Sequence, residues 1–131
     1  MIVLDTHVII WDALAPERLS EPARMAIAQA NQSDGLIICD ISVWEIAMLL
    51  QKGWVQVQAD PLAFINLVLQ ANKVRVQAIT PHIAILAVQF SAQINQDPAD
   101  RLIAATTLAE NATLVTADRN LQAASLIPTL W

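Results

Sequence analysis

Four acidic residues, each on a different segment, stand where strands are expected to end or helices to begin. They are Asp5, Glu45, Asp100 and Asp118. In an open parallel sheet, ligands bind beyond the carboxyl ends of the strands, where the N-termini of the following helices also point. We expect Asp5 and Asp118 directly after strands, and Glu45 and Asp100 in the first turns of helices. The sequence therefore predicts four carboxylates at one edge of a sheet.

Such a cluster of acids predicts a site for divalent cations. At ~4 Å and an effective dielectric constant of ~20, two carboxylates repel each other by about 4 kcal/mol. The cluster persists only if protons or cations neutralise it. Ligands that are all oxygen, with no His or Cys among them, suit Mg²⁺ or Mn²⁺ and disfavour Zn²⁺. Ions held in this way activate water and stabilise the leaving oxygen when a phosphodiester is cleaved, and in two-metal sites they lie about 3.5–4 Å apart.

Each acid also has a purely structural interpretation. Ser42 and Glu45 have the spacing of a capping box, in which the glutamate only satisfies backbone donors at the start of a helix. The run Asp97-Pro98-Ala99-Asp100 is typical of an N-cap followed by proline and a first-turn acid. Asp5 and Asp118 fit turn positions after strands. Capping does not explain an acid at the end of the first strand, and Glu45 lies on so apolar a helix that its carboxylate needs a partner.

The elements that must position these acids alternate between strands and helices. Ser20 and the pairs Asp60-Pro61 and Asp97-Pro98 are typical helix starts, and Gly53 is a typical helix end. The helix that carries Glu45 is apolar on almost every side, which predicts a buried helix. We expect strands at 2–4, 36–39, 74–79 and 113–116, a short extended piece at 54–58, and helices at 21–32, 42–50, 60–71, 81–94 and 97–110.

Alternation of this kind implies parallel strand pairing and helices on both faces of the sheet. The predicted fold class is therefore α/β, a three-layer α/β/α domain around a central, mainly parallel sheet. No repeat or domain boundary divides the sequence, so we expect a single domain over residues 1–131. The two glycines are too few for a Gly-rich phosphate loop, which excludes nucleotide binding by that route.

The composition excludes several classes of protein. Of the 131 residues, 56% are hydrophobic and 15% are charged, against a typical charged share of about 25%, so long charged or disordered tails are excluded. No apolar run approaches the ~18 residues of a membrane-spanning helix, and no basic segment precedes an apolar one as in a signal peptide. The single cysteine, Cys39, cannot form a disulfide within the chain. We therefore expect a cytoplasmic protein without membrane association.

The net charge of −5 by itself argues against a nucleic-acid partner, because proteins that bind phosphate usually carry a basic surface. The chain has 12 acidic and 7 basic residues. When the candidate site acids are set aside, seven acids remain against seven bases, so if these acids converge on cations, the excess negative charge belongs to the site and not to the surface. The acids set aside are Asp5, Glu45, Asp97, Asp100 and Asp118.

Other side chains are weaker candidates. His7 comes two residues after Asp5, where it is within reach of a phosphate, but a lone histidine is more often packed or hydrogen-bonded. Cys39 lies in an apolar strand and is expected to be an inert core residue. Arg101 and Arg119 directly follow site acids, which suits either phosphate contact or ion pairs with those acids. Base stacking is possible for the tryptophans, although core or subunit contacts are favoured for most of them: Trp11, Trp44, Trp54 and Trp131.

Four motifs occur in a recognisable order. They are Asp5-Thr6-His7 after an Ile-Val-Leu run, Ser42-Val43-Trp44-Glu45-Ile46-Ala47, Asp97-Pro98-Ala99-Asp100-Arg101-Leu102-Ile103-Ala104-Ala105, and Leu114-Val115-Thr116-Ala117-Asp118. In this order and at this spacing the sequence closely resembles the PIN-domain family, in particular the VapC-type toxins of bacterial toxin–antitoxin modules. The resemblance extends from the first residues to about Asn120.

The resemblance implies a three-layer PIN fold and an endoribonuclease that depends on Mg²⁺ or Mn²⁺. Such an enzyme cleaves RNA to leave 5′-phosphate and 3′-hydroxyl ends and inhibits translation when its antitoxin releases it. The implied partners are RNA and a cognate antitoxin protein, and the high apolar content fits a homodimer. The family's catalytic and metal-binding quartet falls on Asp5, Glu45, Asp100 and Asp118, and the supporting positions fall on Thr6, Asp97, Arg101 and Thr116.

The sequence departs from the family pattern at one position. Asn95 stands where relatives often carry histidine, which affects a substrate contact there and not the metal ligands. Two alternatives have other functions. A response-regulator receiver also places acids at strand ends, but it needs a lysine after a late strand, and Lys52 and Lys73 do not fit. A catalytically silent PIN-like module that binds protein or RNA is the second alternative, against which the intact acidic quartet argues.

Overall fold

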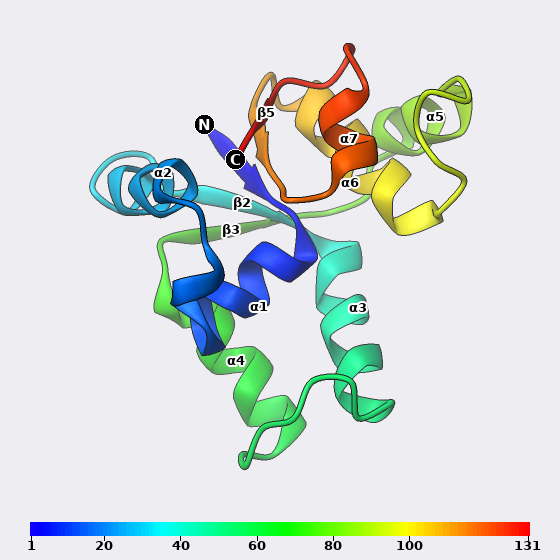
Figure 1. Ribbon diagram of the computed structural model, residues 1–131. Coiled ribbons are helices and arrows are strands. Elements are labelled where there is room, and N and C mark those ends of the chain that lie inside the picture. Colours follow the sequence, from blue (N-terminus) through cyan, green and yellow to red (C-terminus); the bar gives the residue numbers. More distant parts are fainter.

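The computed structural model describes residues 1–131, which fold around one five-stranded sheet (Figure 1). The order across the sheet is β3-β2-β1-β4-β5, and every neighbouring pair is parallel. This confirms the predicted α/β class with a parallel central sheet. The strands are β1 (Ile2–Leu4), β2 (Leu36–Cys39), β3 (Val74–Gln77), β4 (Thr113–Val115) and β5 (Thr129–Leu130).

Seven α-helices and one short 3₁₀ helix connect the strands. Six α-helices begin after a Ser, Thr or Asp whose side chain accepts a backbone N–H of the first turn, and four of the six have proline at one of their first two positions. These caps confirm the predicted starts at Ser20, Asp60 and Asp97. The helices are α1 (Thr6–Leu14), η1 (Pro16–Arg18), α2 (Glu21–Asn31), α3 (Asp40–Gln51), α4 (Pro61–Ala71), α5 (Pro81–Gln89), α6 (Pro98–Ala109) and α7 (Arg119–Ala123).

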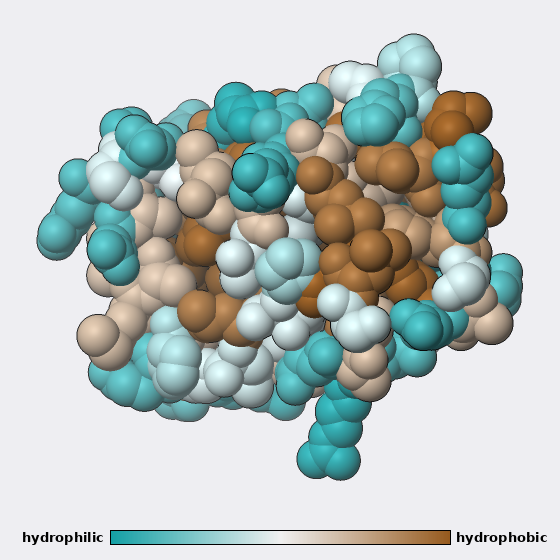
Figure 2. Space-filling model, turned by 90° about the horizontal axis from the view of Figure 1, so that it is seen from above, coloured by the Kyte–Doolittle hydropathy of each residue, from teal (hydrophilic) through white to brown (hydrophobic).

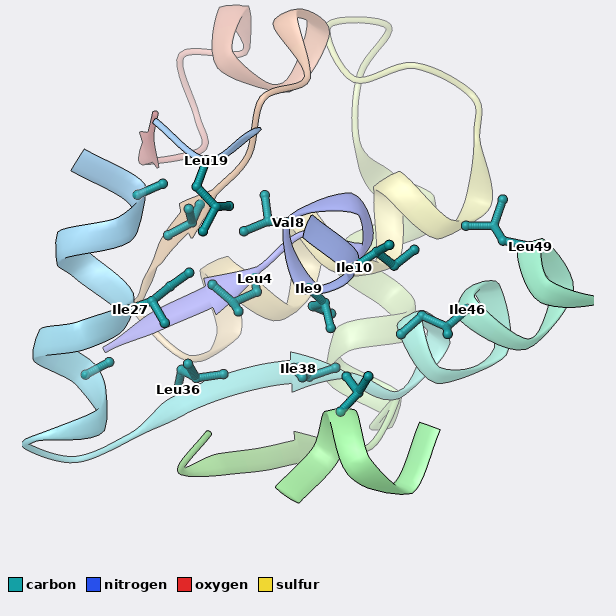
Figure 3. Packing of buried hydrophobic residues seen from close by; sticks show 14 of the residues in the cluster. Leu4, Val8, Ile9, Ile10, Leu19, Ile27, Leu36, Ile38, Ile46 and Leu49 are labelled. Atoms are coloured by element: carbon teal, nitrogen blue, oxygen red, sulfur yellow. The ribbon is translucent and has the colours of Figure 1, made fainter. Parts of the chain in front are cut away.

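The helices form a layer on each face of the sheet because successive strand residues point to opposite sides. Leu4, Leu36 and Ile38 belong to the cluster that also contains buried residues of α1 to α4 (Figure 3). Val3, Ile37 and Leu114 belong to the second cluster, with buried residues of α6 and α7. Helix α5 packs against α6 in a third, smaller cluster. The predicted three layers are therefore present.

Cys39 lies in the second cluster with no exposed surface, and burial raises the pKa of its thiol. The expectation of a buried core cysteine is confirmed. No helix of the structure is both long enough and apolar enough to cross a membrane.

Several elements differ from the predicted ones. Helix α1 follows β1 directly, where no helix was predicted, and α7 and β5 add to a region expected to be a short tail. Strand β3 ends at Gln77 instead of residue 79. Residues 54–58 form no strand, so the predicted extended piece has no partner in the sheet. Helix α5 ends at Gln89 and not near residue 94, because the backbone of Phe90 is extended.

Helix α3 also differs from its prediction. It begins at Asp40, and Ser42 is a helical residue instead of its N-cap, so the predicted capping box is wrong. Only one face of the helix is buried, and Trp44 is 59% exposed, so the expectation of a helix buried on all sides is also wrong. Gly53 has φ +74, which suits glycine after the end of a helix, and this part of the prediction is confirmed.

The order of the strands positions the candidate site. The chain places β2 and then β3 on one side of β1, and β4 and then β5 on the other. Between β1 and β4 the direction of winding therefore reverses, and at the carboxyl ends of such strands α/β proteins open a crevice. Asp5 directly follows β1, and Asp118 lies three residues after β4. The predicted edge of the sheet is thus also its topological switch point.

Candidate active site

A cavity of 430 Å³ opens at this edge of the sheet. Another cavity of 360 Å³ lies at the opposite edge, but Asp34 is the only acid that lines it. The cavity at the carboxyl edge therefore has the concentration of negative charge. Its lining consists of Asp5, Thr6, His7, Trp11, Glu45, Asp97, Asp100, Ala117 and Asp118. All four predicted acids and Asp97 thus border one space.

Asp5 is the most deeply buried of these acids, with 8% of its surface exposed. It caps α1: its Oδ1 accepts the backbone N–H of Thr6 at 2.8 Å, and its Oδ2 accepts the hydroxyl of Thr116 at 2.7 Å. Burial raises the pKa of Asp5 above its usual range, and the bonds from Thr116 and Thr6 act in the opposite direction. Thr116 thus ties the first acid to the strand that leads to Asp118.

Glu45 is held by a chain of two buried hydroxyl groups. The hydroxyl of Thr6 donates to Glu45 Oε1 at 2.5 Å and lies 2.9 Å from the hydroxyl of Ser42. Since the one proton of Thr6 is given to Glu45, Ser42 donates to Thr6. Burial raises the pKa of Glu45, and the charges of Asp5 and Asp97 raise it further.

Asp100 lies in the first turn of α6, and Asp97 caps the same helix. Burial raises the pKa of Asp100 to about 6, with contributions from the charges of Asp5, Asp97 and Asp118. The amide of Asn95 donates to Asp100 Oδ2 at 2.9 Å and lowers that pKa. Asp97 Oδ1 accepts the backbone N–H of Ala99 and of Asp100, which confirms its predicted role as a cap.

Asp118 is both a helix cap and a member of the cavity lining. Its Oδ1 accepts the backbone N–H of Leu121 at the start of α7, and its own N–H donates to the hydroxyl of Thr116. The structural interpretation is confirmed for Asp97 as an N-cap and for Asp100 as a first-turn acid. Asp5 and Asp118 are helix N-caps instead of turn residues, so the expectation that capping does not explain Asp5 is wrong. The structural interpretation does not compete with the chemical interpretation, because the same carboxylates border the cavity.

Arg101 does not have either of its expected contacts. Its guanidinium donates only to backbone carbonyl oxygens, those of Ala87, Phe90, Ser91, Ile94 and Asn95. It forms no ion pair with the acids, since the one salt bridge of the protein joins Arg75 and Glu110. All its donors are occupied, so phosphate contact would require these bonds to break. Arg101 acts on the loop before α6 and not on the cavity.

The weaker candidates fall into two groups. His7 and Trp11 line the cavity, and their rings lie 6.0 Å apart between centroids. Trp11 also contacts Trp131, and the guanidinium of Arg18 lies over its ring. Trp44 and Trp54 are exposed at 59% and 71%, so neither lies in the core. Arg119 is exposed beside Asp118 without an ion pair.

The donor set fits a hard divalent cation. Glu45, Asp100 and Asp118 each use one carboxylate oxygen to accept a hydrogen bond from the protein, which leaves their other oxygen free. These bonds fix the orientation of the ligands from behind, as outer hydrogen bonds do in metal sites. No three His, Cys, Asp or Glu side chains form a ready-made metal-binding group. Binding therefore requires the carboxylates to approach one another, which their mutual repulsion opposes in the absence of a cation.

Two residues of the site were not predicted to belong to it. Ser42 was interpreted as a helix cap, and its contact with Thr6 joins residues 36 positions apart. Asn95 was noted only as a departure from a family pattern, yet it contacts Asp100. The buried polar serine three residues before Glu45 was a usable signal. No local pattern indicates the contact of Asn95.

Comparisons with known proteins agree with the geometry. The sequence model of the PIN domain matches residues 2–126. The chain is 38% identical to Ribonuclease VapC22 of Mycobacterium tuberculosis over 121 residues, which are 92% of this chain and 89% of that protein.

Among solved structures, VapBC2 from Rickettsia felis has a chain with a TM-score of 0.75 and 17% identity, covering 99% of this chain and 98% of that one. VapBC from Salmonella typhimurium gives a TM-score of 0.71 at 19% identity, covering 98% and 96%. These structures show that the chain shares their fold, and the sequence matches show the family to which it belongs. We conclude that the chain is a VapC-type member of the PIN domain family.

Proposed function

We propose that this chain is a metal-dependent endoribonuclease, the toxin of a type II toxin–antitoxin system, and that it hydrolyses RNA phosphodiesters with Mg²⁺ or Mn²⁺. The observation that carries the proposal is the convergence of Asp5, Glu45, Asp100 and Asp118, from four segments of the chain, on one cavity. The pKa values of three of them are raised by burial, as expected of acids that await a cation. The ribonuclease name of the 38%-identical relative supports the same reaction.

In this proposal the four acids hold the metal. Held by these residues, a divalent ion would supply activation of water and neutralisation of the charge that develops on the phosphodiester oxygens. Thr116 holds Asp5 and Thr6 holds Glu45, and both carboxylates line the cavity. Because burial raises the pKa values of Asp5, Glu45 and Asp100, metal binding releases protons and strengthens as the pH rises.

The proposed partners are RNA, an antitoxin protein and a second copy of the chain. The structural neighbours include a toxin–antitoxin complex from Klebsiella pneumoniae. A third cavity, of 550 Å³ and mostly apolar, shares His7 and Trp11 with the acidic one, so a peptide bound there would reach the acids. Apolar residues also form a patch bordered by polar ones on the face seen in Figure 2. Exposed apolar area of this kind is typical of partner surfaces.

We place the protein in the cytoplasm as a single domain over residues 1–131, since its proposed substrate, RNA, is there. The supporting residues of the proposal are Thr6, Asp97, Arg101 and Thr116, of which Arg101 acts through the loop that it holds.

The test is a ribonuclease assay with the purified chain, free of antitoxin, on total RNA. We expect cleavage with Mg²⁺ or Mn²⁺, none with EDTA, and a loss of about 100-fold for Asp5→Asn and Asp100→Asn, which corresponds to about 3 kcal/mol of lost charge stabilisation. Asp34→Asn, at the other edge of the sheet, is the matched control and should cleave like the wild type. Equal RNA decay in all samples, or no decay by the wild type, would refute the proposal. The second result would favour the silent binding module.

A further inference from the structure

The side chain of Arg101 holds the loop between α5 and α6, residues 90–97, through hydrogen bonds to its backbone. Arg101 donates from Nε to the carbonyl of Asn95, from Nη1 to those of Ala87 and Phe90, and from Nη2 to those of Ser91 and Ile94, at 2.8–3.3 Å. A guanidinium has five N–H donors, and each one has a carbonyl here. The planar group therefore fixes the path of the loop backbone.

This loop presents the side chain of Asn95 in one orientation. Asn95 Oδ1 accepts the backbone N–H of Asp97 at 2.9 Å, and Asn95 Nδ2 donates to Asp100 Oδ2 at 2.9 Å. Turning the amide over would place nitrogen against the N–H of Asp97 and oxygen against a carboxylate. The amide nitrogen of Asn95 must therefore face Asp100.

The same residue is also anchored to the segment that carries Asp118. The backbone N–H of Asn95 donates to Asn120 Oδ1 at 3.1 Å, and Asn120 lies two residues after Asp118 at the start of α7. Asn95 thus contacts Asp100 through its side chain and the α7 segment through its backbone. A shift of the loop would displace Asp100 relative to Asp118.

We infer that Asn95 is a positioning residue that orients Asp100 as a metal ligand, an inference that rests on the proposed function. The amide engages Oδ2 and leaves Oδ1 as the oxygen of Asp100 without a protein donor. A neutral amide suits this task better than lysine or arginine would. It stabilises the carboxylate with a dipole but leaves intact the negative charge that attracts the cation. The side chain of Arg101 is basic and lies close to Asn95, but its guanidinium donates only to backbone carbonyl groups.

The test is calorimetric titration of the antitoxin-free chain with Mn²⁺ in the absence of RNA. Asn95→Ala removes both side-chain bonds, while Asn95→Ser keeps an acceptor for the N–H of Asp97 and loses the donor to Asp100. We expect both variants to bind Mn²⁺ about 10-fold more weakly than the wild type, the lower end of the range for outer hydrogen bonds in metal sites. Thermal unfolding of each metal-free variant shows that it is folded.

Asn72→Ala is the matched control. Asn72 is likewise half-buried, donates to the carboxylate of Asp12 at 2.8 Å and accepts from Asn31, but lies outside the acidic cavity. Its loss should leave Mn²⁺ affinity unchanged. Wild-type affinity in both Asn95 variants, or in Asn95→Ser alone, would overturn the inference while leaving the proposed function in place. A wild type that binds no Mn²⁺ would overturn both.

Discussion

Replacing Asp100 by asparagine should make the metal-free protein more stable at pH 8. The carboxyl group lies in the first turn of α6, and burial together with the charges of Asp5, Asp97 and Asp118 raises its pKa to about 6. Asparagine has the same shape, keeps an oxygen for the bond from Asn95 and carries no charge. The substitution therefore removes the cost of an ionised group and little else.

The magnitude follows from the change in pKa on folding. The folded protein binds the proton of Asp100 more tightly than the unfolded chain does, so stability falls as the pH rises from 3.8 to about 6 and stays reduced above that range. At 1.36 kcal/mol per pH unit this difference amounts to about 3 kcal/mol. Because the side chain is partly exposed, solvent screening reduces it to ~2 kcal/mol. That is roughly 6–10 °C in Tm for a chain of this size.

Urea unfolding with EDTA, followed by tryptophan fluorescence at pH 8 and pH 4, measures this effect. We expect Asp100→Asn to exceed the wild type by about 2 kcal/mol at pH 8 and to match it at pH 4. Asp34→Asn, an exposed acid at the opposite edge, should change neither value. Equal stability of Asp100→Asn and wild type at pH 8, or the same gain at both pH values, would refute the electrostatic reasoning.

Three further predictions concern stability and metal. Arg101→Ala should lower the free energy of unfolding, measured in urea, by about 3 kcal/mol, because five carbonyl groups lose a charged donor. A loss below about 1 kcal/mol would contradict the inference that Arg101 fixes the loop between α5 and α6. Thr116→Val leaves a buried carboxylate oxygen of Asp5 without its donor, so it should lower the free energy of unfolding by about 1–3 kcal/mol at pH 8. It should also raise the pKa of Asp5 still further, which ¹³C NMR can follow. An unchanged titration would show that the bond is not important. Mn²⁺ at about 100 times its Kd should stabilise the wild type by about 2.7 kcal/mol, and EDTA should reverse the gain; an equal gain in Asp5→Asn would place the ion elsewhere.

The parts of the fold that could be predicted are those specified by local sequence. Ser20, Asp60 and Asp97 cap helices through bonds to their own first turns, so neighbouring residues contain the whole signal. The acids at strand ends could be predicted because a short apolar run that stops at an aspartate is typical of a buried strand that reaches the edge of its sheet. The same reasoning located the edge of the sheet at which Asp5 and Asp118 lie.

The parts that could not be predicted depend on contacts between distant residues. Helix α1 buries Val8, Ile9 and Ile10 in succession, so its apolar residues have no helical period to detect. Ser42 matches a capping box, but its hydroxyl bonds to Thr6 from another helix. Helix α5 ends earlier than predicted, next to Phe90, whose carbonyl accepts a hydrogen bond from Arg101, eleven residues further along.

The central position of β1 also affects how the protein is made. Asp5 is synthesised long before the hydroxyl that holds it, which belongs to Thr116, 111 residues later. A nascent chain that ends before residue 113 has β2 available on one side of β1 and nothing on the other. Contacts that span so much sequence form late in folding. The acidic cavity is therefore complete only after Thr116 and Asp118 have been synthesised.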